Sequence, residues 1–183
     1  MVIAAGTQLL NPDYLLAEVL QVGAGARLAD FGCCATAINT LTAAKLVGEK
    51  GQVFAVDILK NVLSSVASHA VHEGLVNIKT VWADLEIPGS TKLAEESVDF
   101  VLMVNILFQA KDPKVILAEA RRVLKFGGLA LIVEWRTRAE GLGPEPARRI
   151  DEEKMRALAA AAQLTIAKTA PVGQYHYGLV VTK

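Results

Sequence analysis

The sequence predicts an α/β protein: a three-layer, doubly wound domain built on a seven-stranded, mostly parallel sheet with an antiparallel C-terminal strand. Short apolar runs typical of buried strands alternate with stretches that have helical apolar spacing. The last two expected strands are joined by a turn too short for a parallel crossover, so they must be antiparallel. No repeat or linker interrupts this alternation, and residues 1–183 are therefore expected to form a single domain.

The first half of the chain contains three expected strands, at residues 28–31, 53–56 and 76–82. Before them, Asn11 and Pro12 suit the N-cap and first turn of a helix, which Gly23 and Gly25 would end. Its apolar face consists of Leu15, Leu16, Val19 and Leu20. A helix that Thr36 can cap follows the first strand, and another over residues 60–73 follows the second.

The second half begins with a polar segment, residues 85–97, which is expected to be a loop with room for one short helix. Residues 98–104 are almost continuously apolar, as expected of a central strand buried on both faces. A helix begins at Asp112-Pro113, and Gly127-Gly128 is expected to end it before a fifth strand at 129–133. A helix over 151–162 and strands at 164–169 and 175–182 complete the chain.

Composition limits the classes of partner. The chain has 19 Lys and Arg against 19 Asp and Glu, so no net field favours nucleic acid. The N-terminus lacks the pattern of a signal peptide, and no apolar run reaches the roughly 20 residues that span a bilayer. Cys33 and Cys34 are adjacent, without the spacing of a metal site, so no metal is expected. These features predict a cytoplasmic protein without a nucleic-acid or membrane partner.

Acidic residues follow two of the expected strands. Asp30 and Asp57 stand at the ends of the first and second strands, and Gly32 makes the turn after the first. In an open α/β sheet these strand ends frame the ligand crevice. A nicotinamide dinucleotide would require G-x-G-x-x-G at this turn, and residues 32–37 (GCCATA) lack two of the three glycines. A dehydrogenase is therefore the least favoured interpretation.

Taken together, several segments resemble the class I S-adenosylmethionine-dependent methyltransferases over nearly the whole chain. The matching segments are 28–33 (LADFGC), 56–57 (VD), 83–85 (ADL), 98–101 (VDFV), 122–128 (RVLKFGG) and 175–179 (YHYGL). Each segment alone is weak, but their order and spacing support the resemblance. It implies a cofactor, S-adenosylmethionine. The neutral overall charge and the lack of an added recognition domain then favour a small-molecule methyl acceptor.

The resemblance also implies roles for individual residues. Asp57 matches the acceptor of the ribose hydroxyls, with Ile58 packing on the adenine, while Asp84 matches the position that binds the adenine amino group, beside Leu85. Asn105 matches the position near the methionine amino group and the reactive methyl. Together with Asp30, Gly32 and Cys34 of the first turn, these are the expected cofactor-binding residues. No catalytic base is assigned, although Glu134, His176 and the tyrosines are candidates near the expected methyl.

The first turn departs from the family pattern, because Cys34 and Thr36 stand where glycines are usual. If position 34 needs a positive φ, a cysteine there costs about 1–2 kcal/mol. A second interpretation is therefore a non-catalytic relative with weak or lost cofactor binding, acting as a binding or assembly protein. The sequence names neither the methyl acceptor nor the oligomeric state, for which a homodimer is one option.

Overall fold

One sheet organises the structure. The computed structural model describes residues 10–138 and 141–183, and within them seven strands form a single sheet in the order β3-β2-β1-β4-β5-β7-β6. The strands are β1 (Arg27–Phe31), β2 (Gln52–Asp57), β3 (Ile78–Trp82), β4 (Val98–Val104), β5 (Leu124–Trp135), β6 (Thr165–Ala170) and β7 (His176–Thr182). Strand β7 runs antiparallel to both of its neighbours, and the other pairings are parallel. The predicted fold class is confirmed.

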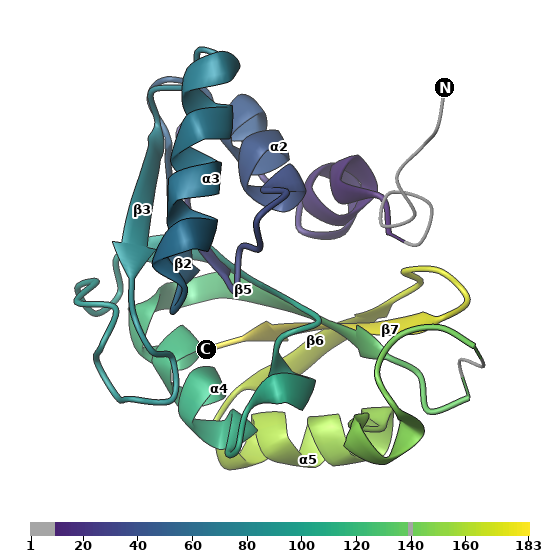
Figure 1. Ribbon diagram of the computed structural model, residues 1–183. Helices are drawn as coiled ribbons and strands as arrows, with labels where there is room; N and C mark the ends of the chain where they lie inside the picture. The colour runs from purple at the N-terminus through teal and green to yellow at the C-terminus, as the bar shows by residue number, and fades with distance from the viewer. Residues whose placement is uncertain (1–9, 139–140) are drawn as a thin grey trace.

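Helices cover both faces of the sheet (Figure 1). On one face lie α2 (Ile38–Val47), α3 (Lys60–His72) and a short π-helix, η1 (Tyr14–Val19); on the other lie α4 (Pro113–Val123) and α5 (Glu152–Ala161). Two single-turn 3₁₀ helices, η2 (Leu107–Gln109) and η3 (Pro146–Arg148), follow β4 and β5. Strand β4 alternates between the two layers, because Leu102 packs with the core under η1 while Met103 packs with the core under α4 and α5.

The boundary between α4 and β5 differs from the prediction. The helix ends at Val123 rather than at Gly127-Gly128, and β5 begins at once with the buried Leu124, which pairs with Val98. Residues 125–128 then form an irregularity in the ladder before Leu129 pairs with Phe100. Gly128 is required there, because a Cβ would lie 2.9 Å from the Asp99 carbonyl oxygen. The two glycines therefore shape a bulge within a strand instead of ending a helix.

Smaller differences occur in the first half of the chain. Asn11 accepts from the Tyr14 backbone N–H at 3.2 Å as predicted, but the helix it begins is a π-helix that ends at Val19. Thr36 does not cap α2; its hydroxyl lies 3.1 Å from the Cys34 Sγ. Strand β3 starts at Ile78 rather than at Val76, which is exposed. The 85–97 segment contains turns but no helix.

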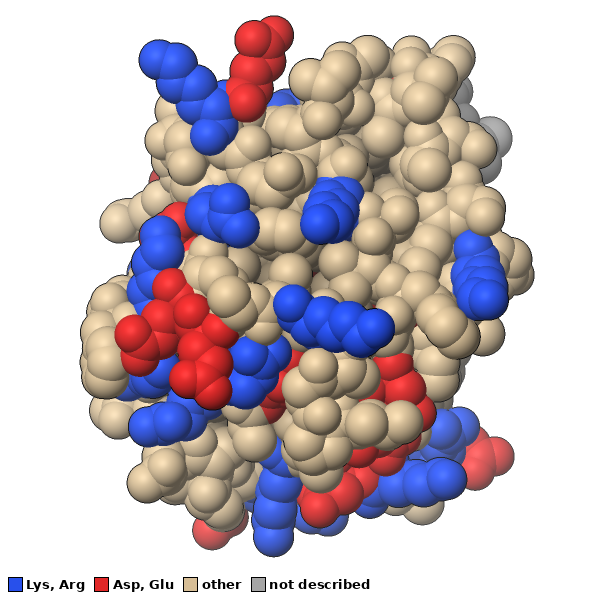
Figure 2. Space-filling model, turned by 90° about the vertical axis from the view of Figure 1, so that its left-hand side faces the viewer, with Lys and Arg blue, Asp and Glu red and all other residues tan. Residues whose placement is uncertain are grey.

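The open β3 edge of the sheet carries dispersed charge. On this face, lysine and arginine side chains are separated by uncharged residues or stand beside acidic ones, which occur at the top and more densely in the lower half (Figure 2). The face therefore lacks a continuous basic stripe of the kind that follows a nucleic-acid backbone. Within residues 10–138 and 141–183, none of the helices combines the length and apolarity needed to cross a bilayer.

Candidate functional site

A cavity of about 620 Å³ opens at the carboxyl ends of β1, β2 and β4. Strands β2 and β3 lie on one side of β1, and the chain then crosses over to β4 on the other side of β1. Strand order therefore reverses here, which is where doubly wound sheets bind their ligands. Of the eight residues predicted to bind a cofactor, seven line the cavity: Gly32, Cys34, Asp57, Ile58, Asp84, Leu85 and Asn105. The sequence prediction and the cavity therefore select the same place.

The turn after β1 has an unusual backbone. Gly32 has a φ of +73°, and a Cβ at this position would lie 2.4 Å from the Ile106 Cδ1. Cys34 adopts a left-handed φ of 52°, and so does Ala37 at 53°. Position 34 thus has the positive φ that strains a cysteine, at a cost in folding free energy of about 1–2 kcal/mol.

The two cysteines of the turn have different environments. Cys33 is buried in the small cluster beneath α2 and α3, and burial raises the pKa of its thiol. Cys34 is exposed and lines the cavity. Cys33 is thus a small buried core residue, whereas Cys34 is available to a ligand in the cavity.

Asp30 lies behind the cavity rather than in its wall. Its side chain is 1% exposed and accepts a 2.6 Å hydrogen bond from the Thr40 hydroxyl of α2. Burial raises the pKa of Asp30 to about 6, although the Thr40 bond opposes this shift and the negative charge of Asp57 adds to it. Asp30 is therefore placed to hold α2 against β1, and its contact with a cofactor stays a prediction.

The two acidic residues of the wall that the sequence predicted, Asp57 and Asp84, stand at or just past the end of a strand. Asp57 accepts from the Leu59 backbone N–H at 2.9 Å, just before α3 begins. Asp84 accepts from the Glu86 N–H at 2.9 Å, which fixes the start of the 85–97 loop. Both carboxylates keep further lone pairs for a ligand, since each carboxylate can accept about four hydrogen bonds.

The charge of the wall is one-sided. The described lining residues include the carboxylates of Asp57, Asp84 and Glu86, and no lysine or arginine. A phosphate-bearing nucleotide would be repelled there, whereas a ligand with positive charge and hydroxyl groups would be favoured. This observation also counts against the dehydrogenase interpretation.

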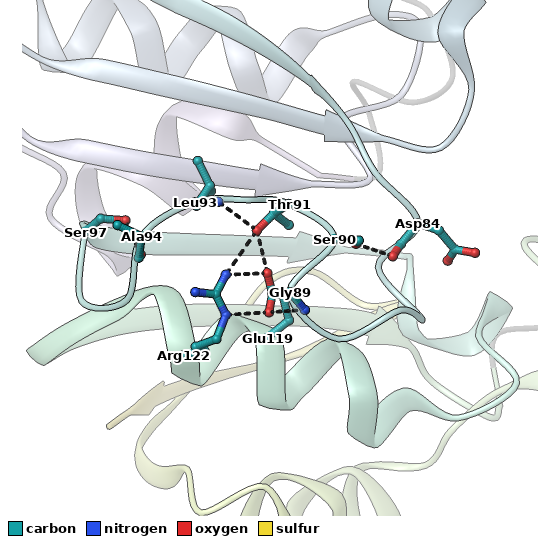
Figure 3. Close-up of polar contacts among 9 residues, drawn as sticks. All are labelled: Asp84, Gly89, Ser90, Thr91, Leu93, Ala94, Ser97, Glu119 and Arg122. Carbon is teal, nitrogen blue, oxygen red and sulfur yellow. Dashed lines mark hydrogen bonds and ion pairs between the residues drawn. The ribbon is translucent and has the colours of Figure 1, made fainter.

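A buried ionic network, which the sequence interpretation missed, holds the acidic wall in place (Figure 3). The Glu119 carboxylate of α4 accepts from the Thr91 hydroxyl at 2.5 Å, the Gly89 N–H at 3.2 Å and Arg122 at 2.8 Å. The Ser90 hydroxyl donates to the Asp84 carbonyl. The network thereby ties the 85–97 loop, which follows directly on Asp84, to α4. The i,i+3 spacing of an acidic and a basic residue in a predicted helix was the available signal.

Glu119 stays ionised despite its burial. Burial alone would raise the pKa of its carboxyl, but hydrogen bonds from Arg122 and Thr91, the charge of Arg122 and the Gly89 N–H together lower it. A matching interaction with Glu119 raises the pKa of Arg122. The pair is therefore charged over the physiological pH range.

Asn105 links the cavity to a second polar region. Its backbone has a left-handed φ of 55°, and its side-chain Nδ2 lies 3.2 Å from the Nε2 of His176 on β7. Glu134, at the end of β5, accepts from the Leu107 N–H at 2.7 Å and the Phe108 N–H at 3.3 Å, which lie just past Asn105. His176 and Glu134, two of the candidates predicted near the expected methyl, thus contact Asn105 or the residues that follow it, although neither lines the cavity. None of the tyrosines, the other predicted candidates, is among the described lining residues, and Tyr177 donates its hydroxyl to the Ile150 carbonyl.

The comparison with protein families assigns the chain to a class. Residues 29–132, more than half of the chain, match the model of the methyltransferase domain. The chain therefore belongs to the methyltransferase-domain family, and the predicted family is confirmed.

Part of the chain is also similar to individual methyltransferases. A demethylmenaquinone methyltransferase of Bacillus velezensis is 31% identical over 118 residues, which is 64% of this chain and 48% of that protein. The chain thus spans about half the length of the curated relatives it matches.

Solved structures agree on the fold. A SAM-dependent methyltransferase from Aquifex aeolicus superposes with a TM-score of 0.87 at 24% identity, over 98% of this chain and 93% of that one. The [4+2]-cyclase SpnF superposes with a TM-score of 0.73 at 23% identity, over 85% of this chain and 57% of that one. Proteins that catalyse different reactions share this fold, so the fold alone does not define the reaction.

Proposed function

We propose that this protein is an S-adenosylmethionine-dependent methyltransferase that acts on a small molecule. The observation that carries the proposal is the acidic cavity at the strand-order reversal, whose described lining offers carboxylates but no cation. S-adenosylmethionine has a positively charged sulfur, ribose hydroxyls and no phosphate, and therefore suits such a wall. A volume of about 620 Å³ also falls within the range of small-molecule sites.

The residues of the wall fit the parts of this cofactor. Asp57 would accept from the ribose hydroxyls and Asp84 from the adenine amino group, with Ile58 and Leu85 against the ring. Gly32 would bring the backbone close to the methionine part, because it has no Cβ. The bound cofactor would supply a methyl group on a sulfur that leaves as a neutral thioether. The protein then has to align the acceptor with that methyl and exclude water, and alignment of this kind accounts for much of the catalysis.

Demethylmenaquinone is the first acceptor to test, because relatives at about 30% identity carry its name. The match covers about half of those proteins, so a panel of other small acceptors belongs beside it. Transfer would be measured by mass spectrometry as a gain of one methyl group on the acceptor together with formation of S-adenosylhomocysteine.

Cofactor binding is tested by calorimetric titration of the full chain with S-adenosylhomocysteine. Asp57→Asn keeps an acceptor for the Leu59 N–H but removes the charge, so we expect about 10- to 100-fold weaker binding, equivalent to the roughly 1.5–3 kcal/mol of a charged hydrogen bond. Glu49→Gln is the matched control, since Glu49 is exposed beyond α2 and does not line the cavity. Absence of binding by the wild-type protein would refute the proposal and favour a non-catalytic relative.

A further inference from the structure

Glu134 carries a fully buried carboxyl group that the proposed function leaves unused. It stands near the end of β5, is 0% exposed and does not line the cavity. Its Oε2 is buried and has no hydrogen-bond partner among the described residues. Burying a carboxyl group costs free energy that incomplete pairing does not recover, so stability alone does not explain a glutamate at this position.

The other oxygen of Glu134 is paired with backbone groups. Oε1 accepts from the Leu107 N–H at 2.7 Å and from the Phe108 N–H at 3.3 Å, both in η2. Burial raises the pKa of the carboxyl to about 7, and the backbone N–H groups of Leu107, Phe108, Trp135 and Ile106 oppose this shift. Three consecutive N–H groups, those of residues 106–108, therefore converge on this side chain.

The turn that Glu134 holds is part of the cavity wall. Residues 105–110, called the 105–110 segment below, follow β4 and contribute Asn105, Ile106, Gln109 and Ala110 to the lining. The Gln109 side-chain amide donates to the Asn105 carbonyl at 2.8 Å, which closes the segment on itself. Asn105 has a left-handed φ of 55°, a backbone that a residue other than glycine keeps only where its surroundings enforce it.

The same segment touches the turn after β1. The Ile106 side chain lies so close to Gly32 that a Cβ added to the glycine would be 2.4 Å from the Ile106 Cδ1. Ile106 directly precedes Leu107 and Phe108, whose N–H groups Glu134 accepts. A change at Glu134 can therefore reach the turn after β1 through the Ile106 side chain.

We propose that Glu134 is a positioning residue for cofactor binding. Its carboxyl oxygen fixes the 105–110 segment, so that Ile106 packs on Gly32 and Asn105 stays in the wall of the cavity. Glu134 is not a catalytic base in this arrangement, because its buried carboxyl group contacts backbone and does not reach the cavity. The inference rests on the proposed function, since the wall that Glu134 shapes is the one assigned to S-adenosylmethionine.

Two substitutions of similar size separate the acceptor oxygen from the volume of the side chain. Glu134→Gln keeps an oxygen for the two N–H groups of η2, whereas Glu134→Met fills similar space with a thioether that accepts only weakly. Calorimetric titration of the full chain with S-adenosylhomocysteine should show at least tenfold weaker binding by Glu134→Met, and Glu134→Gln should stay within threefold of wild type.

Val181→Ala is the control for a general loss of stability. Val181 is buried near the other end of β7 and does not line the cavity, so its truncation weakens the core without touching the 105–110 segment. Its affinity for S-adenosylhomocysteine should stay within twofold of wild type.

Amide hydrogen exchange, followed by NMR, gives a readout that a merely structural role would not move. In Glu134→Met, the amides of Leu107 and Phe108 should exchange at least tenfold faster than in wild type, relative to those of Leu102 and Met103 in β4. A general loss of stability would instead accelerate all four amides alike.

The outcomes separate this inference from the proposed function. If the wild-type protein binds S-adenosylhomocysteine, the positioning role is overturned when Glu134→Met binds within twofold of wild type. It is also overturned when Glu134→Gln loses as much affinity as Glu134→Met. In both cases the methyltransferase proposal stands.

Two other outcomes are decided by amide exchange. If the wild-type protein does not bind S-adenosylhomocysteine, the proposed function is refuted. Selective acceleration at Leu107 and Phe108 then supports Glu134 as the residue that holds the segment, and uniform acceleration overturns that role. If Glu134→Met does not fold, the wild-type protein decides, because protection of these two amides should rise when S-adenosylhomocysteine binds, and protection that does not rise overturns the inference.

Discussion

The Glu119–Arg122 network allows a prediction that connects stability with the cavity. Glu119 is 3% exposed, and its two oxygens accept from Thr91, Gly89 and the Nε and Nη2 of Arg122. In Glu119→Gln, one oxygen becomes an NH₂ group that faces donors, and Arg122 loses its counter-charge. Breaking a buried ion pair costs about 3–5 kcal/mol. The Arg122 side chain is 26% exposed and partly solvated, so we expect a smaller loss of about 2–3 kcal/mol.

The free energy of unfolding is measured by urea denaturation, with a more exposed ion pair as control. Glu152→Gln makes the same chemical change in the Glu152–Arg156 pair of α5, whose side chains are 32% and 39% exposed. That change should cost less than about 1 kcal/mol. If Glu119→Gln costs no more than Glu152→Gln, the network does not hold the 85–97 loop and our reasoning is wrong.

The same variant reports on the cavity. The loop that Glu119 anchors through Gly89 and Thr91 begins next to Asp84 and Leu85, both of which line the cavity. We therefore expect S-adenosylhomocysteine affinity to fall several-fold in Glu119→Gln and to stay unchanged in Glu152→Gln. A loss of stability without a loss of affinity would mean that the network supports the fold but does not position the wall.

Three further substitutions test other parts of the site. Cys34→Gly removes the strain of a left-handed φ, but glycine also gives the unfolded chain more conformational entropy, so stability should change by less than about 1 kcal/mol. Calorimetry should show tighter S-adenosylhomocysteine binding for Cys34→Gly than for Cys34→Ala, because alanine keeps the strain. Gly32→Ala places a Cβ 2.4 Å from Ile106, whereas at Gly25 (φ +80°) nothing lies within 4 Å. Denaturation should therefore show a loss of about 2 kcal/mol or more for Gly32→Ala against about 1 kcal/mol for Gly25→Ala, and equal losses would contradict the close approach. Burial raises the pKa of Glu134 to about 7 from an ordinary 4.5, so the folded state binds the proton more tightly and wild-type stability falls as pH rises between these values. Glu134→Gln has no carboxyl to titrate, so its stability relative to wild type should improve by up to about 3 kcal/mol between pH 4.5 and 7.5. A difference in stability that does not change with pH would show that the pKa of Glu134 is not raised by folding.

Local patterns were sufficient where the backbone and its nearest neighbours decide the outcome. The nearly continuous apolar run at β4 and the Asp112-Pro113 start of α4 were both found, and Asp112 accepts from the Lys114 N–H as an N-cap should. The pattern failed at Gly127-Gly128 because glycines end helices and also shape bulges. The distinction depends on Asp99, which lies on a different strand and meets Gly128 only after β4 and β5 pair.

The sequence by itself determined the fold class, the carboxyl ends of the first four strands and seven of the residues that line the cavity, because side chains at the carboxyl ends of parallel strands must converge. Only the tertiary structure decided which way those side chains turn: Asp30 points back to Thr40, while Asp57 stays in the wall. It alone joined Asn105 to His176, 71 positions apart, and Glu119 to Thr91, 28 positions apart. Hydrogen bonds over such separations depend on how strands and helices pack, and no local pattern in the sequence encodes them.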